Sequence, residues 1–323
     1  MNDGIKGTCV TLPASPNVFV VIPVFNRLNF TRECLECLRV QTYPRLTLIV
    51  VDGGSTDGTE ETLNREYPDV LVLQGDKELW WAGAMRLGID HALAHRATDD
   101  DMVLMMNNDT LIAPQYVETL VRVSREHDAA VGGLIVDSRD PARIVDAGES
   151  IDWERYTFPV RTTIDPGEVF SDDVDLLSGR GTLVPISMIL RAGNVNAEIF
   201  PHYIADCEFF SRLRRHGFRL GVSYEAVVKA HLDETGLVLK SSRLSTREAW
   251  NLLFCERSIE NIRNHWRFIH HCAPARWRNR AKMLLVMRRI RMVVLKTWLE
   301  PMALPFIWLL HRLRGKQRRV PST

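Results

Sequence analysis

Short apolar runs alternate with helical patterns through the first third of the chain. Each run is rich in Val, Ile, Leu or Met and ends in a polar break, as is typical of strands covered on both faces of a parallel sheet. The runs lie at 18–24, 46–51, 70–73 and 102–106, and helical stretches follow after 27, near 57 and at 82–95. This alternation predicts an α/β fold, an open and mostly parallel sheet flanked by helices.

The later part of the chain follows a different pattern. After about Pro141 the alternation is lost, and we expect short strands within 175–184, a helix over 204–216 and a helical, increasingly basic region from 246 onward. We therefore divide the chain into an N-terminal tail (1–17), an α/β domain (18–240, with halves at about 18–110 and 111–240) and a basic helical C-terminal region (241–323). Within the first half, the helix near Asp57 is expected to begin with a capping box completed by Glu60.

The charges are unevenly distributed. Residues 1–275 hold 28 basic and 39 acidic side chains, whereas residues 276–323 hold 13 basic side chains and one acidic. Such an asymmetry points to a polyanionic partner, a membrane or a nucleic acid. The segment 282–314 mixes apolar and basic residues and is interrupted by Pro301 and Pro305, which predicts two amphipathic helices lying on an anionic membrane. A homo-oligomer interface with solvated Arg side chains is the alternative.

The N-terminal residues, the apolar runs and the cysteines together indicate the cellular compartment. The first 17 residues lack a secretory signal, and no run of about 18 uncharged apolar residues is present, so we predict a cytoplasmic protein without a spanning helix. Six cysteines are too few for a disulfide scaffold and are expected to be reduced. Cys34 and Cys37 lie within a helical pattern, and we interpret both as packing residues rather than as a zinc or redox pair.

Polar residues follow each predicted strand. In open α/β sheets ligands bind at the carboxyl ends of the strands, so these residues are the first candidates for a site. The first strand is not followed by G-x-G-x-x-G or by a phosphate-binding G-x-x-x-x-G-K-[ST], which argues against a dinucleotide oxidoreductase and a P-loop enzyme. The candidate segments are 23–27, 52–55, 80–86 and 107–109.

Several ordered motifs together carry a resemblance to a known family. They are VIPVFNR, VDGGSTDGT, WWAGAMRLGI, LMMNNDT, GRGTLVP, PHYIADCEFFSRLRRHGF and a later His231 before Thr235-Gly236, and they span roughly 18–236. In this order and spacing the chain resembles a family 2 glycosyltransferase of the GT-A fold. The resemblance implies a Rossmann-like sheet, a nucleoside diphosphate sugar as donor and a divalent cation, Mg²⁺ or Mn²⁺.

The resemblance assigns Asp109 to the metal and His231 to the metal or the diphosphate, with a structural role as the alternative for His231. Asp109 closes the Asn107-Asn108-Asp109 triplet, where the family pattern is D-x-D, and a carboxylate there would hold a cation that neutralises the leaving diphosphate. Asn107 departs from the first Asp of that pattern, and we assign Asn107 and Asn108 to the donor, with Asn107 contacting ribose, or the metal through water. The alternative is that the triplet only caps the next helix.

Further residues are assigned to the donor on the same resemblance. Asp52 and Gly54 match the segment that contacts the base or ribose, although D-G-G-S is also an ordinary turn sequence. Trp81 would stack on the base or line the sugar pocket, or else act as a packing anchor. Arg86 is displaced by one position from the family's Arg and would reach the diphosphate. Pro23 and Asn26, after the first strand, complete the set.

Asp206 matches the family's catalytic base. A base must take the proton of the acceptor hydroxyl as it attacks the anomeric carbon. The Glu that often precedes this Asp is Ala205 here, and Glu208 is expected to orient neighbouring groups. An unassisted Asp opposite the leaving group implies single displacement, so we expect an inverting enzyme. Gly179-Arg180-Gly181 matches the segment that lines the acceptor side.

The sugar donor and the acceptor are predicted only from the similarity to particular members of the family. Asn-Asn-Asp-Thr together with GRGTLVP is similar to rhamnosyltransferase-like members, so dTDP-rhamnose is the first donor hypothesis and a UDP-hexose the second. The acceptor would be a bacterial surface glycan or a polyprenyl-linked glycan on the inner leaflet, with no nucleic-acid partner. A catalytically inactive scaffold that binds nucleotide sugar remains the alternative, whereas a nucleotidyltransferase would carry a Gly-rich basic loop in place of Phe25-Asn26-Arg27.

Overall fold

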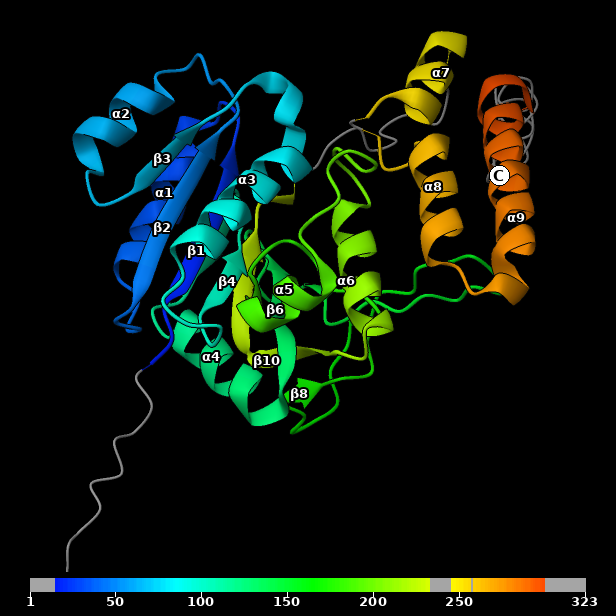
Figure 1. The fold of residues 1–323 in the computed structure, drawn as a ribbon. Helices are drawn as coiled ribbons and strands as arrows, with labels where there is room; N and C mark the ends of the chain where they lie inside the picture. Colours follow the sequence, from blue (N-terminus) through cyan, green and yellow to red (C-terminus); the bar gives the residue numbers. More distant parts are fainter. Residues whose placement is uncertain (1–14, 233–244, 257, 300–323) are drawn as a thin grey trace, which may run out of the picture.

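One mixed sheet runs through the protein (Figure 1). The computed structural model describes residues 15–232, 245–256 and 258–299. The strands in these residues are β1 (Val18–Val24), β2 (Leu46–Asp52), β3 (Leu71–Gln74), β4 (Met102–Met105), β5 (Thr110–Ile112), β6 (Ala129–Asp137), β7 (Ile144–Asp146), β8 (Phe170–Ser171), β9 (Thr182–Pro185) and β10 (Arg219–Ala230). Their order is β3-β2-β1-β4-β9-β6-β10-β5, with β7 beside β6 and β8 beside β10.

The first half of the sheet is parallel, as the alternation predicts. Strand β1 pairs with β2 and β4, and β2 pairs with β3, all in parallel. Alternate β1 residues enter two different cores, Phe19 and Val21 on one face and Val20 and Ile22 on the other. Helix α3 (Trp80–His95) packs on the first face, while α1 (Leu28–Arg39) and α2 (Thr59–Glu66) pack on the second (Figure 1). The unbroken apolar run of β1 is thus explained by burial on both faces.

Two local predictions have different outcomes in this half. Cys34 and Cys37 lie on α1 against the second core, so the prediction of packing residues is confirmed. The predicted capping box is wrong. Helix α2 begins at Thr59 after Gly58, which has a φ of 83° and provides no side-chain cap. The Asp57 carboxylate instead accepts a hydrogen bond from the backbone N–H of Leu28 at 2.9 Å, which ties the start of α1 to this loop.

The second half of the sheet mixes both directions. Strand β9 lies antiparallel between β4 and β6, and β10 is parallel to β6 but antiparallel to β5 and β8. The predicted helix over 204–216 is confirmed as α6, and of the strands predicted within 175–184 only β9 forms. The helices of this half are α4 (Tyr116–His127), α5 (Ile186–Ala192) and α6 (Ala205–Arg215).

The C-terminal helices pack against the same core. They are α7 (Thr246–Phe254), α8 (Ile262–Cys272) and α9 (Ala275–Val294), followed by a π-helical turn at Leu295–Leu299. Phe268 of α8 and Leu285 of α9 belong to the core that contains Phe209 of α6. Figure 1 shows α8 beside α6, with α9 outermost.

The tail prediction is tested in part. The helical C-terminal region is present, and its segment from Ala275 to Val294 forms one continuous helix, α9. Residues from Glu300 onward, which include Pro301 and Pro305, lie outside the described residues, so the predicted division into two amphipathic helices stays a prediction. None of the described helices combines the length and the apolar character needed to cross a membrane.

Candidate active site

The loop after β1 adopts an unusual backbone conformation. Asn26 and Arg27 both have positive φ values, 58° and 65°, which residues other than glycine rarely adopt. The Asn26 N–H donates to Ser55 Oγ at 2.7 Å, and its side-chain Oδ1 accepts from the Thr56 N–H at 2.9 Å. Backbone strain of this kind persists only where surrounding contacts fix it, and it gathers at functional sites.

Asp52 organises the loop after β2. The residue is buried at the last position of the strand, and its Oδ1 accepts from both the N–H and the hydroxyl of Ser55, at 2.9 and 2.6 Å. Gly54 has a φ of 82°, a value that favours glycine. Pro23 pairs in register with Val51, one residue before Asp52. The predicted donor residues Pro23, Asn26, Asp52 and Gly54 therefore lie together at one edge of the sheet.

The Asn-Asn-Asp triplet connects β4 to β5, and its three side chains have three environments. Asn107 Oδ1 accepts from the indole N–H of Trp81 at 2.9 Å. Asn108 is buried and donates to Thr31 Oγ1 of α1 at 3.0 Å, so its amide fixes the triplet to that helix. Asp109 is buried as well. Its Oδ1 makes no hydrogen bond within the described part of the chain, and its Oδ2 lies 3.5 Å from Arg27 Nη1.

His231 lies directly against Asp109. Its backbone N–H donates to the Asp109 carbonyl oxygen at 3.0 Å, because His231 follows β10 where that strand pairs with β5. Nδ1 lies 3.1 Å from Ser138 Oγ, and the ring packs against Phe30. The buried Nε2 has no hydrogen-bond partner among the described residues. Glu33 Oε2 lies 3.7 Å from this Nε2. The two predicted metal residues are therefore neighbours, and each has a buried atom that makes no hydrogen bond to the described residues.

Asp206 is the second residue of α6, and backbone groups hold its carboxylate. Oδ1 accepts from the Cys207 N–H at 2.9 Å, and Oδ2 accepts from the Gly179 N–H at 3.3 Å. Burial raises the pKa of Asp206, while these two N–H groups and the charge of Arg180 act in the opposite direction. A carboxylate with a raised pKa is a stronger base than an exposed one, which suits proton abstraction.

Trp81 joins the triplet to this carboxylate. Its indole N–H reaches Asn107, and its ring lies so close to Gly179 that a Cβ there would sit 2.4 Å from Trp81 Cζ2. Gly179 in turn donates to Asp206. A path of direct contacts therefore runs from the triplet through Trp81 and the Gly179 backbone to Asp206.

Arg86 is not part of this group. Its guanidinium lies 3.2 Å from Glu198 Oε1 and 3.8 Å from Asp90 Oδ2, in a polar hollow that Asn194 and Arg212 also line. Because this Arg is displaced by one position in the sequence, its side chain leaves α3 on a different face of the helix than the family's Arg would.

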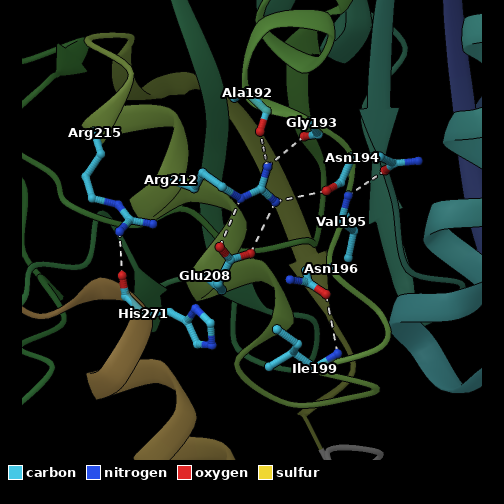
Figure 2. Close-up of polar contacts among 10 residues, drawn as sticks. All are labelled: Ala192, Gly193, Asn194, Val195, Asn196, Ile199, Glu208, Arg212, Arg215 and His271. Atoms are coloured by element: carbon cyan, nitrogen blue, oxygen red, sulfur yellow. Dashed lines mark hydrogen bonds and ion pairs between the residues drawn. The ribbon is translucent and has the colours of Figure 1, made fainter.

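Helix α6 is anchored by Arg212 (Figure 2). The guanidinium pairs with both carboxylate oxygens of Glu208, at 2.9 and 3.2 Å. It also donates to three consecutive backbone carbonyl oxygens at the C-terminal end of α5. These acceptors are Ala192, Gly193 and Asn194. Glu208 thus orients a neighbouring group, as expected, and the pair fixes the helix that carries Asp206.

Two further acidic residues lie near Asp206, and the sequence did not predict a place for them in the site. Asp146 is the last residue of β7. Glu149 lies three residues further along the chain and forms backbone bridges to Val160 and Leu176. Burial and the charges of Asp146 and Asp206 raise the pKa of Glu149 to about 8. The stretch lies in the part of the chain where the alternation is lost, so its sequence could not place it beside the site.

Two protein-family models match this chain. A family model described as "Glycosyl transferase family group 2" matches residues 102–311, and one described as "Glycosyl transferase family 2" matches 19–173. The first of these covers more than half of the chain. The chain belongs to the family 2 glycosyltransferases.

Curated relatives of this glycosyltransferase match over short segments. GlyA of Streptococcus pneumoniae is 28% identical over 120 residues, 36% of this chain and 16% of that protein. GlyG of the same organism is 29% identical over 117 residues, 35% of this chain and 37% of that protein. AglE of Haloferax volcanii is 34% identical over 82 residues, 24% of this chain and 27% of that protein. The glycosyltransferase therefore matches well under two thirds of the length of these relatives.

Solved structures show the same fold. A mannosyltransferase from Pyrobaculum calidifontis, solved in complex with GDP-Man and Mn²⁺, superposes with a TM-score of 0.52 at 18% identity, over 96% of this chain and 82% of that one. S. aureus TarS gives 0.50 at 13% identity, over 88% and 44%. The predicted GT-A fold is confirmed by this likeness.

The residues of the glycosyltransferase fit a metal site in which the protein supplies only some of the ligands and the substrate phosphates and water supply the others. Among the described residues no three His, Cys, Asp or Glu side chains gather to hold an ion. Mg²⁺ is commonly held by one or two carboxylates together with substrate phosphates and water. Asp109 Oδ1 and His231 Nε2 are buried and make no hydrogen bonds to the described residues, so they match such a partial set, with Glu33 Oε2 3.7 Å from Nε2.

The pKa of Glu149 predicts how stability depends on pH. Because its folded-state pKa is about 8 against a usual 4.5, the folded protein binds a proton more tightly than the unfolded chain does between these values. Stability should therefore fall as pH rises through this window. Glu149→Gln removes the titration, so we expect its melting temperature relative to wild type to be higher at pH 8.5 than at pH 5. The exposed Glu154→Gln is the control, and a pH-independent difference for Glu149→Gln would contradict the prediction.

Proposed function

We propose that this glycosyltransferase moves a sugar from a nucleoside diphosphate donor to a glycan acceptor by single displacement with inversion. The observation that supports one shared site is the contact path from Asn107 through Trp81 and Gly179 to Asp206. A donor bound at the strand edge and an acceptor approaching Asp206 would meet along this path.

In this proposal each group has one task. Asp206 takes the proton of the acceptor hydroxyl while the hydroxyl oxygen attacks the anomeric carbon. The bond from that carbon to the diphosphate breaks, and its electron pair leaves with the diphosphate. Asp52 and the strained Asn26 loop hold the nucleoside. Asp109 and His231 would hold Mg²⁺ or Mn²⁺, which supplies charge neutralisation at the diphosphate.

We propose dTDP-rhamnose as the donor and a bacterial surface glycan or polyprenyl-linked glycan as the acceptor, with the enzyme working at the cytoplasmic face of the membrane. The support for the donor is the similarity of the Asn-Asn-Asp-Thr and GRGTLVP segments to rhamnosyltransferase-like members. The support for the acceptor is the basic C-terminal region, with 13 basic residues and one acidic in 276–323.

A thermal-shift screen tests the proposal. Nucleoside diphosphates and nucleotide sugars, with and without Mg²⁺ or Mn²⁺, should raise the melting temperature, since a ligand at 100 times its Kd stabilises the fold by about 2.7 kcal/mol. Asp109→Asn should lose the metal-dependent part of the shift, because the amide is a weaker metal ligand. The exposed Asp99→Asn should behave as wild type. If no nucleotide shifts the melting temperature with either metal, the donor hypothesis is wrong.

A further inference from the structure

One face of α9 is apolar and exposed. Met283, Met287, Ile290 and Val294 are 55, 58, 59 and 41% exposed. Their spacing of four, three and four residues places them in one line along a helix that turns about 100° per residue. We call these four residues the α9 stripe. Large apolar side chains gathered in this way mark an interaction surface more often than single exposed ones do.

The stripe is fixed in orientation because the opposite face of α9 is anchored. Ala281 and Leu285 are buried in the main core. Arg288 donates to the backbone oxygens of Arg155 and Tyr156, and Arg289 Nε donates to the Glu260 oxygen at 3.1 Å. The helix therefore cannot roll to hide the stripe.

The charges of α9 itself are of one sign, and Glu154 lies 3.8 Å from Arg280 as an acidic neighbour of this helix near the stripe. Helix α9 contains seven basic residues and no acidic residue. At about 100° per residue, Arg276, Arg280 and Arg291 fall on or beside the line of the stripe. All three are exposed. An apolar strip edged with Arg is the pattern that binds the interface of an anionic bilayer, where the apolar side chains enter the acyl boundary and the cations meet lipid phosphates.

Other occupants of the stripe would meet unfavourable charge. A two-fold contact between two copies through this face would bring Arg276 and Arg291 of one copy against the basic residues of the other. The chain's own residues 301–323 carry five basic residues and no acidic one, so they offer no complementary charge either.

We propose that the α9 stripe, together with Arg276 and Arg291 on or beside its line, docks the enzyme on an anionic lipid bilayer. This inference deepens the proposed function by naming the surface that meets the membrane of a lipid-linked acceptor. It is tested without sugar transfer, so its failure and the failure of the proposed activity are distinguishable.

Vesicle flotation of the full chain tests the inference. The vesicles are phosphatidylcholine alone, or phosphatidylcholine partly replaced by phosphatidylglycerol. Wild type should float with the anionic vesicles, less so at high salt. Met283→Ser/Met287→Ser/Ile290→Ser should bind at least about tenfold more weakly. Arg276→Gln/Arg291→Gln should lose the preference for phosphatidylglycerol.

Two further variants make the result decisive. The control, Val40→Ser/Val169→Ser/Leu190→Ser, removes apolar side chains that are 58, 54 and 43% exposed elsewhere, and it should float as wild type does. A tail variant, Ile307→Ser/Trp308→Ser/Leu309→Ser, tests residues beyond the described region. The inference is overturned if the stripe variant floats like wild type, or if only the tail variant loses binding. It is also overturned if wild type fails to float and is a dimer that the stripe variant dissociates.

Discussion

Asp206→Asn is expected to lower kcat by about 10²–10⁴-fold, the usual contribution of a general base. Asn is nearly isosteric and keeps an oxygen that can accept from the Cys207 or Gly179 N–H, so the fold and the donor site should persist. The Kd for the donor should therefore change little. Single-turnover rates with saturating donor and acceptor, alongside calorimetric donor binding, check both parts.

Asp172→Asn is the matched control for this variant. Asp172 makes an exposed ion pair with Arg219, with a side chain 53% exposed. Its turnover should stay close to that of wild type. Turnover of Asp206→Asn within a few-fold of wild type would remove Asp206 as the base. Donor binding without any turnover in wild type would favour the inactive-scaffold alternative.

Arg212→Met is expected to lower the free energy of unfolding by about 3–5 kcal/mol, because it leaves Glu208 as an uncompensated buried charge. The side chains of Arg212 and Glu208 are only 16 and 5% exposed. The variant also removes the donor for the carbonyl groups that end α5 (Figure 2). Urea-induced unfolding, followed by far-UV circular dichroism, measures the change.

Arg122→Met provides the comparison for a surface Arg. Arg122 also contacts two carboxylates, those of Glu126 and Glu225, but its side chain is 48% exposed. Its loss should therefore change the stability by only about 1 kcal/mol or less. Arg212→Met/Glu208→Leu should recover part of the stability lost in Arg212→Met, since no buried charge then lacks a partner. Equal effects of Arg212→Met and Arg122→Met would show that burial does not matter here.

Local pattern was enough to predict the parallel half of the sheet. Strands β1, β2 and β4 are largely apolar runs, and each is followed by a loop that holds a predicted residue, such as Gly54 or Asp109. A parallel arrangement brings those loops to one edge without further information. The prediction was therefore carried by short-range signals alone.

The second half depends on pairings between distant segments. Strand β9 enters the sheet antiparallel between β4 and β6, and the bridge of Glu149 to Leu176 links short extended pieces with no periodic signal. For this reason the sequence could not bring Asp146 and Glu149 to Asp206. Side-chain direction was equally hidden, since Asn108 turns into α1 and Arg86 turns toward Glu198.

The close contact of Trp81 with Gly179 couples two side chains that lie far apart in the sequence. The Trp81 indole N–H donates to Asn107, and the same ring packs on the Gly179 backbone, whose N–H donates to Asp206. A bulkier residue at position 179, or a smaller ring at position 81, would therefore displace the surroundings of Asn107 and of Asp206 together. Substitutions at either position are expected to act on both ends of this chain of contacts rather than on one alone.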